Sequence, residues 1–275
     1  MINLSNILIT GGESTISQEL PFGIKLSREE LDITNRNQIA QAIKKINPTA
    51  ILNLASKDLH HCEKDPFRAY DVNVIGMYNL ATEAEKSGIP VIMISSGAVF
   101  NGKIGQRFDE NEIPNPQNFY GQSKYVAELL LQEVTERYSI IRTGWLFGLK
   151  HRPTGFSKFI DMVIDTKDEN VRINATESTG SPTYINDFIE ELGRVIKIGK
   201  PGTWHIVNSE LGSAYDVAQE IAKITQVSKL IEKTESSEII GNSKRSMSEA
   251  LYSNKVIMRS WQEALRDYIS NRDFR

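Results

Sequence analysis

Hydrophobic residues follow two alternating patterns along the chain. Short runs of aliphatic, often β-branched residues predict buried strands at 6–10, 23–26, 50–54, 91–96, 139–142, 171–173 and 204–207. Between these runs, apolar residues at helical spacing predict helices at 14–20, 32–46, 66–86, 119–137, 155–166, 185–198, 214–225 and 261–269. Strands and helices that alternate in this way build βαβ units, so the pattern predicts an α/β fold with a doubly wound parallel sheet.

Candidate chemistry lies where one of these strands ends. The run 91–96 closes with Ser95 and Ser96, and parallel α/β sheets bind ligands at the carboxyl ends of their strands. Tyr120 and Lys124 are four residues apart and share one face of the predicted helix. A lysine ammonium beside a phenol lowers the phenol pKa from about 10, and a serine hydroxyl nearby can hold a carbonyl group. These groups together favour carbonyl reduction with hydride from a nicotinamide.

A loop directly after the first predicted strand is placed to bind a dinucleotide. Gly11 stands first in the glycine fingerprint, whose glycines let the backbone turn and approach a pyrophosphate. Ser14 and Ser17 occupy the second and third glycine places. We expect their Cβ atoms to crowd a phosphate and their hydroxyls to offer it a donor. From this loop alone, a cofactor loop and a plain strand-to-helix turn are equally favoured.

Arg28 follows the second predicted strand, where a cofactor ribose or its 2′-phosphate would be read. The strand ends at Ser27, so no acid stands there to accept a hydrogen bond from a free 2′-hydroxyl. An arginine without that acid favours NADP(H) as the cofactor, and NAD(H) is the alternative. Arg28 could also be an ordinary solvent-exposed arginine that contacts no cofactor.

The regular order of elements loosens after Gly148. We expect residues 1–145, joined by about 171–208, to form a dinucleotide-binding domain. Residues 146–170 and 209–275 would form a small C-terminal substrate-binding portion. The polar, serine-rich stretch 232–248 predicts a mobile loop.

Composition narrows the class of protein. The 275 residues are 40% hydrophobic and 24% charged, as in a soluble globule, and the net charge of −3 without a basic run argues against nucleic acid or an anionic membrane as main partner. No stretch reaches the ~20 apolar residues of a membrane span.

Cys62 is the only cysteine and the N-terminus has no leader pattern, so we expect a cytoplasmic protein without an internal disulfide. We expect no metal site, because His60 and His61 are adjacent and point in different directions. The absence of a Gly-x-Ser-x-Gly elbow argues against a hydrolase.

Over nearly its whole length the chain resembles the extended short-chain dehydrogenases/reductases, and among them the dTDP-4-dehydrorhamnose reductases. The Tyr-x-x-x-Lys pattern at 120–124 marks the superfamily. The more specific matches are Arg142-Thr143-Gly144-Trp145 and Gly180-Ser181-Pro182-Thr183-Tyr184. The resemblance implies a Rossmann fold and NADP(H)-dependent reduction of a nucleotide-linked 4-keto-6-deoxy sugar, for polysaccharide or nucleotide-sugar biosynthesis. It also implies a nucleotide-sugar as partner. A homodimer is a separate expectation, which the sequence does not settle.

The resemblance assigns roles to individual positions. Ser96, Tyr120 and Lys124 match the catalytic Ser/Thr, the acid and the lysine that also holds the nicotinamide ribose. Asp32 and Ile33 fall at the adenine, and Leu54, Ala55 and Ser56 fall beside the ribose-phosphate backbone. The expected cofactor contacts are therefore Gly11, Ser14, Thr15, Ile16, Arg28, Asp32, Ile33, Leu54, Ala55, Ser56, Asn73, Lys124 and Thr143. The expected substrate contacts are Ser96, Gly97, Tyr120, Trp145 in the sugar pocket, and Arg245 near the nucleotide-sugar phosphates.

The chain also departs from the family pattern. The family continues its catalytic Ser/Thr with Asp and Tyr, whereas Gly97 and Ala98 follow here, and Ser246 replaces a proline after Arg245. Because Gly97 and Ala98 are small, we expect a sugar pocket with more room and fewer polar contacts. Two alternatives stay open at this point: a catalytically silent nucleotide-sugar-binding or regulatory protein of the same fold, and a related sugar epimerase.

Overall fold

Six parallel strands form the central sheet. The computed structural model describes residues 2–168, 170–228, 230–234, 239–240 and 243–272. The strand order is β2 (Ile24–Leu26), β1 (Ile7–Thr10), β3 (Ala50–Asn53), β4 (Val91–Ser96), β6 (Tyr138–Thr143) and β11 (Gly202–His205). Every neighbouring pair in it is parallel. The order reverses between β1 and β3, and the prediction of a doubly wound α/β sheet is confirmed.

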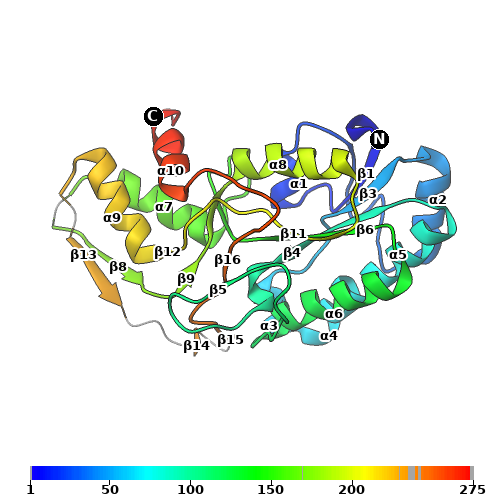
Figure 1. Ribbon diagram of the computed structural model, residues 1–275, viewed down its shortest axis with the longest axis horizontal. Coiled ribbons are helices and arrows are strands. Elements are labelled where there is room, and N and C mark those ends of the chain that lie inside the picture. Colours follow the sequence, from blue (N-terminus) through cyan, green and yellow to red (C-terminus); the bar gives the residue numbers. More distant parts are fainter. Residues whose placement is uncertain (1, 169, 229, 235–238, 241–242, 273–275) are drawn as a thin grey trace.

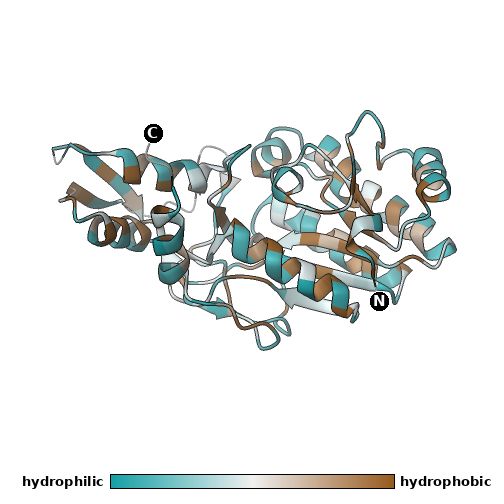
Figure 2. Cartoon of the chain, turned by 90° about the horizontal axis from the view of Figure 1, so that it is seen from above, coloured by the Kyte–Doolittle hydropathy of each residue, from teal (hydrophilic) through white to brown (hydrophobic). Residues whose placement is uncertain are grey.

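The two faces of the sheet bury alternate residues of the same strands. Ile7 and Ile9 of β1 pack with α8 (Ile185–Ile198), on the side where α1 (Thr15–Glu19) also lies. Leu8 faces the opposite way, toward α2 (Arg36–Ile46), α5 (Gly76–Lys86) and α6 (Phe119–Val134). Figure 1 shows these helices on opposite sides of the sheet, and Figure 2 shows their hydrophobic and hydrophilic residues in separate stripes. The helical periodicity of the sequence therefore reports which side of each helix is buried.

The C-terminal part of the chain forms a second lobe at the left of Figure 1. It contains α7 (Gly155–Asp165), α9 (Ala214–Thr225), α10 (Trp261–Ser270) and the parallel pair β8 (Arg172–Thr176) and β13 (Leu230–Thr234). Of the segment 171–208, which we expected to join the first domain, β11 belongs to the central sheet, whereas β8 pairs in this lobe. The domain boundaries stay a prediction.

Short paired strands connect the two lobes. β7 (Trp145–Phe147) pairs with β10 (Pro182–Tyr184), and β5 (Arg107–Phe108) pairs with β16 (Ala250–Leu251). β9 (Thr179–Gly180) pairs with β12 (Gly212–Ser213). A separate local hairpin pairs β14 (Ile239–Ile240) with β15 (Ser243–Lys244). None of these pairs was predicted, because runs of two or three residues carry no periodicity.

The helix predicted at 66–86 is divided. It consists of α4 (Pro66–Tyr70), a π-helical turn (Asp71–Ile75) and α5, and it is preceded by α3 (Leu59–Lys64), which was not predicted. The expected mobile loop at 232–248 includes residues 235–238 and 241–242, which lie outside the described part of the chain. Its last residues are held in place: Lys244 accepts a hydrogen bond from Asn118 (3.0 Å), and Ser248 donates one to Gln106 (2.6 Å).

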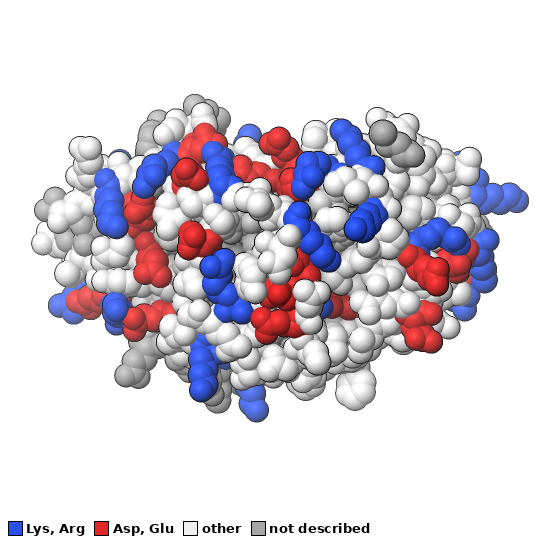
Figure 3. Space-filling view, in the orientation of Figure 1, with Lys and Arg blue, Asp and Glu red and all other residues white. Residues whose placement is uncertain are grey.

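Basic and acidic side chains are intermixed on the face shown in Figure 3. Ion pairs link neighbouring elements at the surface, as when Arg259 bridges Asp187 and Asp267, each at 2.8 Å. Among the described residues, no helix is both long and apolar enough to span a membrane.

Candidate active site

A cavity of about 800 Å³ lies at the carboxyl ends of the central strands. The sheet side of its wall comes from the β1–α1 loop, the ends of β3, β4 and β6, and the first turns of α6. The opposite side comes from the second lobe, including Thr154, Phe156, Arg245 and Glu249. Open α/β sheets bind ligands at such a position, where the strand order reverses. The volume is within the range of ligand sites.

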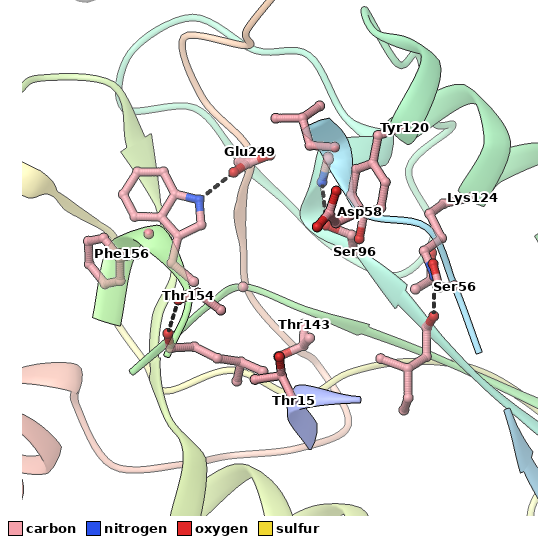
Figure 4. Close-up of a pocket in the computed structure, with 18 of the residues that line it drawn as sticks. Thr15, Ser56, Asp58, Ser96, Tyr120, Lys124, Thr143, Thr154, Phe156 and Glu249 are labelled. Atoms are coloured by element: carbon pink, nitrogen blue, oxygen red, sulfur yellow. Dashed lines mark hydrogen bonds between the residues drawn. The ribbon is translucent and has the colours of Figure 1, made fainter. Parts of the chain in front are cut away.

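Ser96, Tyr120 and Lys124 meet in this cavity, as Figure 4 shows. Ser96 ends β4, and its Oγ accepts a hydrogen bond from the backbone N–H of Ala98 (3.1 Å). Tyr120 and Lys124 are one turn apart in α6, whose N-terminus is capped by Asn118. A Cβ at Gly121 would lie 2.1 Å from the carbonyl oxygen of Ala98. Glycine therefore lets the first turn of α6 pack directly against the residues that follow Ser96.

Burial controls the protonation of Tyr120. Loss of solvent raises the pKa of the phenol above its usual range, the hydrogen bond with Ser96 opposes the rise, and the negative charge of Glu249 adds to it. The expectation that Tyr120 has a lowered pKa is therefore wrong, because desolvation dominates. The phenol is protonated at neutral pH and is suited to donate a proton.

Lys124 is buried beneath the phenol. Its Nζ donates a hydrogen bond to the carbonyl oxygen of Ile94 (3.1 Å) and lies 5.8 Å from the centre of the Tyr120 ring. Burial lowers the pKa of Lys124 to about 8, although Cys62 and Glu128 oppose this. The lysine retains further N–H donors for a ligand in the cavity.

A buried ion pair supports the catalytic strand and helix from behind. Arg142 on β6 donates to both carboxylate oxygens of Glu128 on α6 (2.7 and 3.1 Å), and Ser95 donates to the same carboxylate (2.5 Å). His205 on β11 lies 3.4 Å from Arg142. Since Ser95 precedes Ser96 and Glu128 is one turn beyond Lys124, this network fixes β4 and α6 relative to each other.

The β1–α1 loop combines one glycine that its backbone requires with a serine that caps α1. Gly11 has φ +63°, and a Cβ there would lie 2.7 Å from the backbone nitrogen of Ala55, so glycine is required. Ser14 has an ordinary φ of −67° and caps α1 by accepting from the backbone N–H of Ser17 (3.4 Å). Ser14 is thus unstrained, and the expected crowding of a phosphate by its Cβ stays a prediction. Ser17 is fully buried in α1, away from the cavity wall.

The other expected cofactor contacts divide into two groups. Those that line the cavity are Thr15, Ile16, Leu54, Ser56 and Thr143, together with Ser14 and Lys124. Those outside its lining are Gly11, Arg28, Asp32, Ile33, Ala55 and Asn73.

Three of the residues outside the lining have protein partners. Arg28 lies 3.4 Å from the Asp32 carboxylate on the surface. Ile33 is in the core, which leaves its main chain for a cofactor. Asn73 binds the backbone N–H of Lys57 (2.6 Å) and the hydroxyl of Ser123 (2.9 Å), so it positions the loop after β3. Direct cofactor contact by these three residues stays a prediction.

The expected substrate contacts also divide. Ser96, Tyr120, Trp145 and Arg245 line the cavity, whereas Gly97 does not. A Cβ at Gly97 would lie 2.6 Å from the carbonyl oxygen of Glu249. The expectation that Gly97 enlarges the sugar pocket is therefore wrong, because the main chain of Glu249 fills that room.

Sequence reasoning missed several cavity residues. They include Asp58, Gln117, Asn118, Thr154, Phe156 and Glu249. Asp58 and Thr154 cap the helices α3 and α7, so the local capping pattern carries a signal for their place at a helix start. Glu249 carries no such signal, because only the fold brings it opposite β4.

Comparisons with known proteins agree with this geometry. The family model described as "RmlD substrate binding domain" matches residues 5–273. The spore coat polysaccharide biosynthesis protein SpsK of Bacillus subtilis is 30% identical, with 98% of each chain covered. A dTDP-4-dehydrorhamnose reductase of Aggregatibacter actinomycetemcomitans is 28% identical over 84% of this chain and 77% of its own. The crystal structure of dTDP-4-dehydrorhamnose reductase from Bacillus anthracis in complex with NADP superimposes with a TM-score of 0.86, at 26% identity, and covers 97% of this chain and 99% of that one. The chain belongs to the RmlD substrate binding domain family.

Proposed function

We propose that the protein is an NADP(H)-dependent reductase of a nucleotide-linked 4-keto-6-deoxy sugar, acting in polysaccharide or nucleotide-sugar biosynthesis. The observation that carries the proposal is the meeting of Ser96, Tyr120 and Lys124 in one cavity that Ser14, Thr15 and Ile16 of the β1–α1 loop also line. Relatives named as dTDP-4-dehydrorhamnose reductases support the substrate class.

The residues present fit a dinucleotide cofactor. The glycine-dependent turn at Gly11 brings the β1–α1 loop against the end of β3, and Ser14, Thr15 and Ile16 then line the cavity. These residues would hold the pyrophosphate, and Leu54 and Ser56 would adjoin the ribose-phosphate. Lys124 would hold the nicotinamide ribose. When bound, NADPH supplies the hydride.

The protein's own groups handle the carbonyl oxygen. The hydroxyl of Ser96 holds the C4 oxygen of the sugar, and the O–H of Tyr120 gives its proton to that oxygen as hydride reaches the carbon. The C=O π bond breaks, one C–H and one O–H bond form, and the phenolate regains its proton from solvent. Burial keeps the phenol protonated before the reaction. Lys124, when charged, stabilises the phenolate as it forms.

The second lobe provides the substrate side of the cavity. Trp145 packs against Phe156, with ring centres 5.1 Å apart, and offers an aromatic wall. Arg245 also lines the cavity, and its buried Nε has no hydrogen-bond partner among the described residues. An arginine with free donors suits the diphosphate of a nucleotide sugar.

The test follows NADPH oxidation with dTDP- and other nucleotide-linked 4-keto-6-deoxy sugars. We expect turnover of at least one of them by the wild type. Tyr120→Phe should retain NADPH binding and lose about 10²–10⁴-fold in kcat, the usual contribution of general acid catalysis.

Two outcomes would contradict the proposed reductase. Binding of nucleotide sugar and NADPH without turnover would favour the silent binding protein. Isomerisation of the sugar without net NADPH consumption would favour the epimerase. We also propose that the protein forms a homodimer, which light scattering tests. Its proposed cytoplasmic location is tested by cell fractionation.

A further inference from the structure

The carboxylate of Glu249 enters the cavity from the second lobe and is only partly satisfied. One oxygen accepts a hydrogen bond from the indole N–H of Trp145. Within the described part of the chain, the other oxygen has no hydrogen bond and no ion pair. Figure 4 shows Glu249 on the side of the cavity wall opposite Lys124.

The main chain around Glu249 is rigidly held. Its N–H donates to the carbonyl oxygen of Thr179 (3.0 Å), and the preceding Ser248 exchanges two backbone hydrogen bonds with Gly102, each 2.9 Å. The next two residues form β16, which pairs with β5. The carboxylate is therefore presented by a fixed backbone, which limits the ordering needed when a ligand binds.

The main chain of Glu249 lies against Gly97. Its carbonyl oxygen is 2.6 Å from the place that a Cβ at Gly97 would take. The main chain that fills this room carries a carboxylate of its own. Glu249 therefore fills the space beside Gly97 with its main chain and lines the cavity with its side chain.

The surroundings of Glu249 also affect its protonation. Burial raises the pKa of Glu249, and the Trp145 hydrogen bond and the charge of Arg245 counteract the rise only in part. Glu249 also raises the pKa of Tyr120, so the two groups act in the same cavity. The Glu249 side chain is half-buried, so its unpaired oxygen reaches the cavity and can accept a hydrogen bond from a ligand hydroxyl.

We propose that Glu249 determines sugar specificity by accepting a hydrogen bond from the ring hydroxyl next to the keto carbon held by Ser96 and Tyr120. This inference rests on the proposed function. It assigns Arg245 to the diphosphate and Glu249 to the sugar, which explains why the two side chains line one cavity without forming an ion pair among the described residues.

The experiment compares two substrates and one isosteric variant. The substrates are a dTDP-4-keto-6-deoxy sugar with a hydroxyl at C3 and its 3-deoxy analogue. The wild type should favour the hydroxylated sugar about tenfold to hundredfold in kcat/KM, the usual effect of a hydrogen bond to a charged group. Glu249→Gln should lose most of this preference while its NADPH Kd stays unchanged. Glu133→Gln, at an exposed position of α6, is the matched control and should keep the preference.

The design separates recognition from simple support of Trp145. If Glu249 only holds the indole, Glu249→Gln and Trp145→Phe will reduce kcat/KM equally for both sugars, and the inference is overturned. If the wild type reduces neither sugar, the proposed function fails. Calorimetry with the same two nucleotide sugars then decides the inference: a wild-type preference for the hydroxyl that Glu249→Gln abolishes supports it, and equal binding of both sugars overturns it.

Discussion

Single residues in the cavity are tuned by burial more than by neighbouring charges. Tyr120 stays protonated because its burial disfavours the charged phenolate, although Lys124 is only one turn away. Lys124 itself has a pKa of about 8 for the same reason. Desolvation therefore keeps Tyr120, the acid of the proposed reaction, in its protonated form.

In the β1–α1 loop, a serine that caps α1 stands at the second glycine place of the fingerprint. Ser14 has an ordinary backbone conformation and accepts from the N–H of Ser17, so a second glycine is not needed for the turn. Gly11 alone requires positive φ there. The loop therefore keeps glycine at position 11, where φ is positive. At the second glycine place of the fingerprint it has Ser14, which caps α1.

The prediction at residue scale concerns cofactor choice. Arg28 is well exposed and its contact with Asp32 is a long surface ion pair of 3.4 Å, worth little. The guanidinium is therefore available for the 2′-phosphate. Arg28→Ala should raise the Kd of NADPH roughly tenfold to hundredfold and leave that of NADH nearly unchanged, as measured by fluorescence titration.

Arg36→Ala is the matched control for this measurement. Arg36 pairs with Glu83 on the surface and should not affect either cofactor. An equal loss of NADPH and NADH affinity in Arg28→Ala would remove the assignment of Arg28 to the 2′-phosphate.

At the scale of elements, α6 carries the chemistry and its first turn is placed by three contacts. Asn118 accepts from the N–H of Gly121 (2.8 Å), and Glu63 accepts from the N–H of Phe119 (2.9 Å). Gly121 then allows direct contact with Ala98. The helix start is therefore fixed both to α3 and to the turn after β4.

Gly121→Ala tests this placement. Its Cβ would lie 2.1 Å from a backbone oxygen, so either α6 or the turn after Ser96 must move. We expect a loss of about 1–3 kcal/mol in the free energy of unfolding, and a fall in kcat of about 10²-fold from misplacing Tyr120. Urea unfolding and steady-state kinetics measure the two effects.

Gly193→Ala in α8 provides the control for Gly121→Ala. There the nearest atoms to an added Cβ are 3.7 and 3.8 Å away, an ordinary contact. This variant should gain about 0.5–1 kcal/mol from helix propensity and keep its activity. Full activity in Gly121→Ala would show that the close contact with Ala98 does not position Tyr120.

The whole molecule is joined behind the cavity by buried charged groups. Arg142 and Glu128 connect β6 to α6, and both side chains are almost fully buried. His205 continues the network to Glu110, whose carboxylate accepts from the backbone N–H of His205 (3.2 Å) and from the hydroxyl of Ser253. Segments distant in sequence are thus held together by polar contacts that are largely buried.

This network predicts how stability depends on pH. Burial and the charge of Arg142 lower the pKa of His205 from 6.5 to about 4, although Glu110 opposes this. The unfolded chain therefore binds a proton at higher pH than the folded chain. Stability from His205 is fully present above pH 6.5 and is lost as pH falls toward 4. Between pH 7 and pH 5 we expect a loss of about 2 kcal/mol in the free energy of unfolding.

Urea unfolding across this pH range, with His205→Gln and the exposed His151→Gln, checks the assignment. His205→Gln should flatten the dependence on pH, whereas His151→Gln should retain it. The same slope in His205→Gln and the wild type would show that other groups cause the loss.

Local sequence patterns determined much of this protein. The apolar runs predicted the six central strands, because buried parallel strands are continuously hydrophobic. The spacing of Tyr120 and Lys124, and their place after a strand ending in Ser96, predicted the centre of the cavity. These features depend on residues near one another in sequence or on the general rule that ligands bind at strand ends.

Only the tertiary structure decided the remaining features. The raised pKa of Tyr120 depends on how much of the phenol the folded chain buries, which no local pattern reports. The short pairs that join the lobes form between segments distant in the chain. The relation between Gly97 and Glu249 is of the same kind, since the two residues are separated by about half of the chain and meet only through those pairs. Periodicity and spacing show which side of a helix or strand is buried. The chemistry of the cavity depends instead on contacts between segments that are distant in the chain.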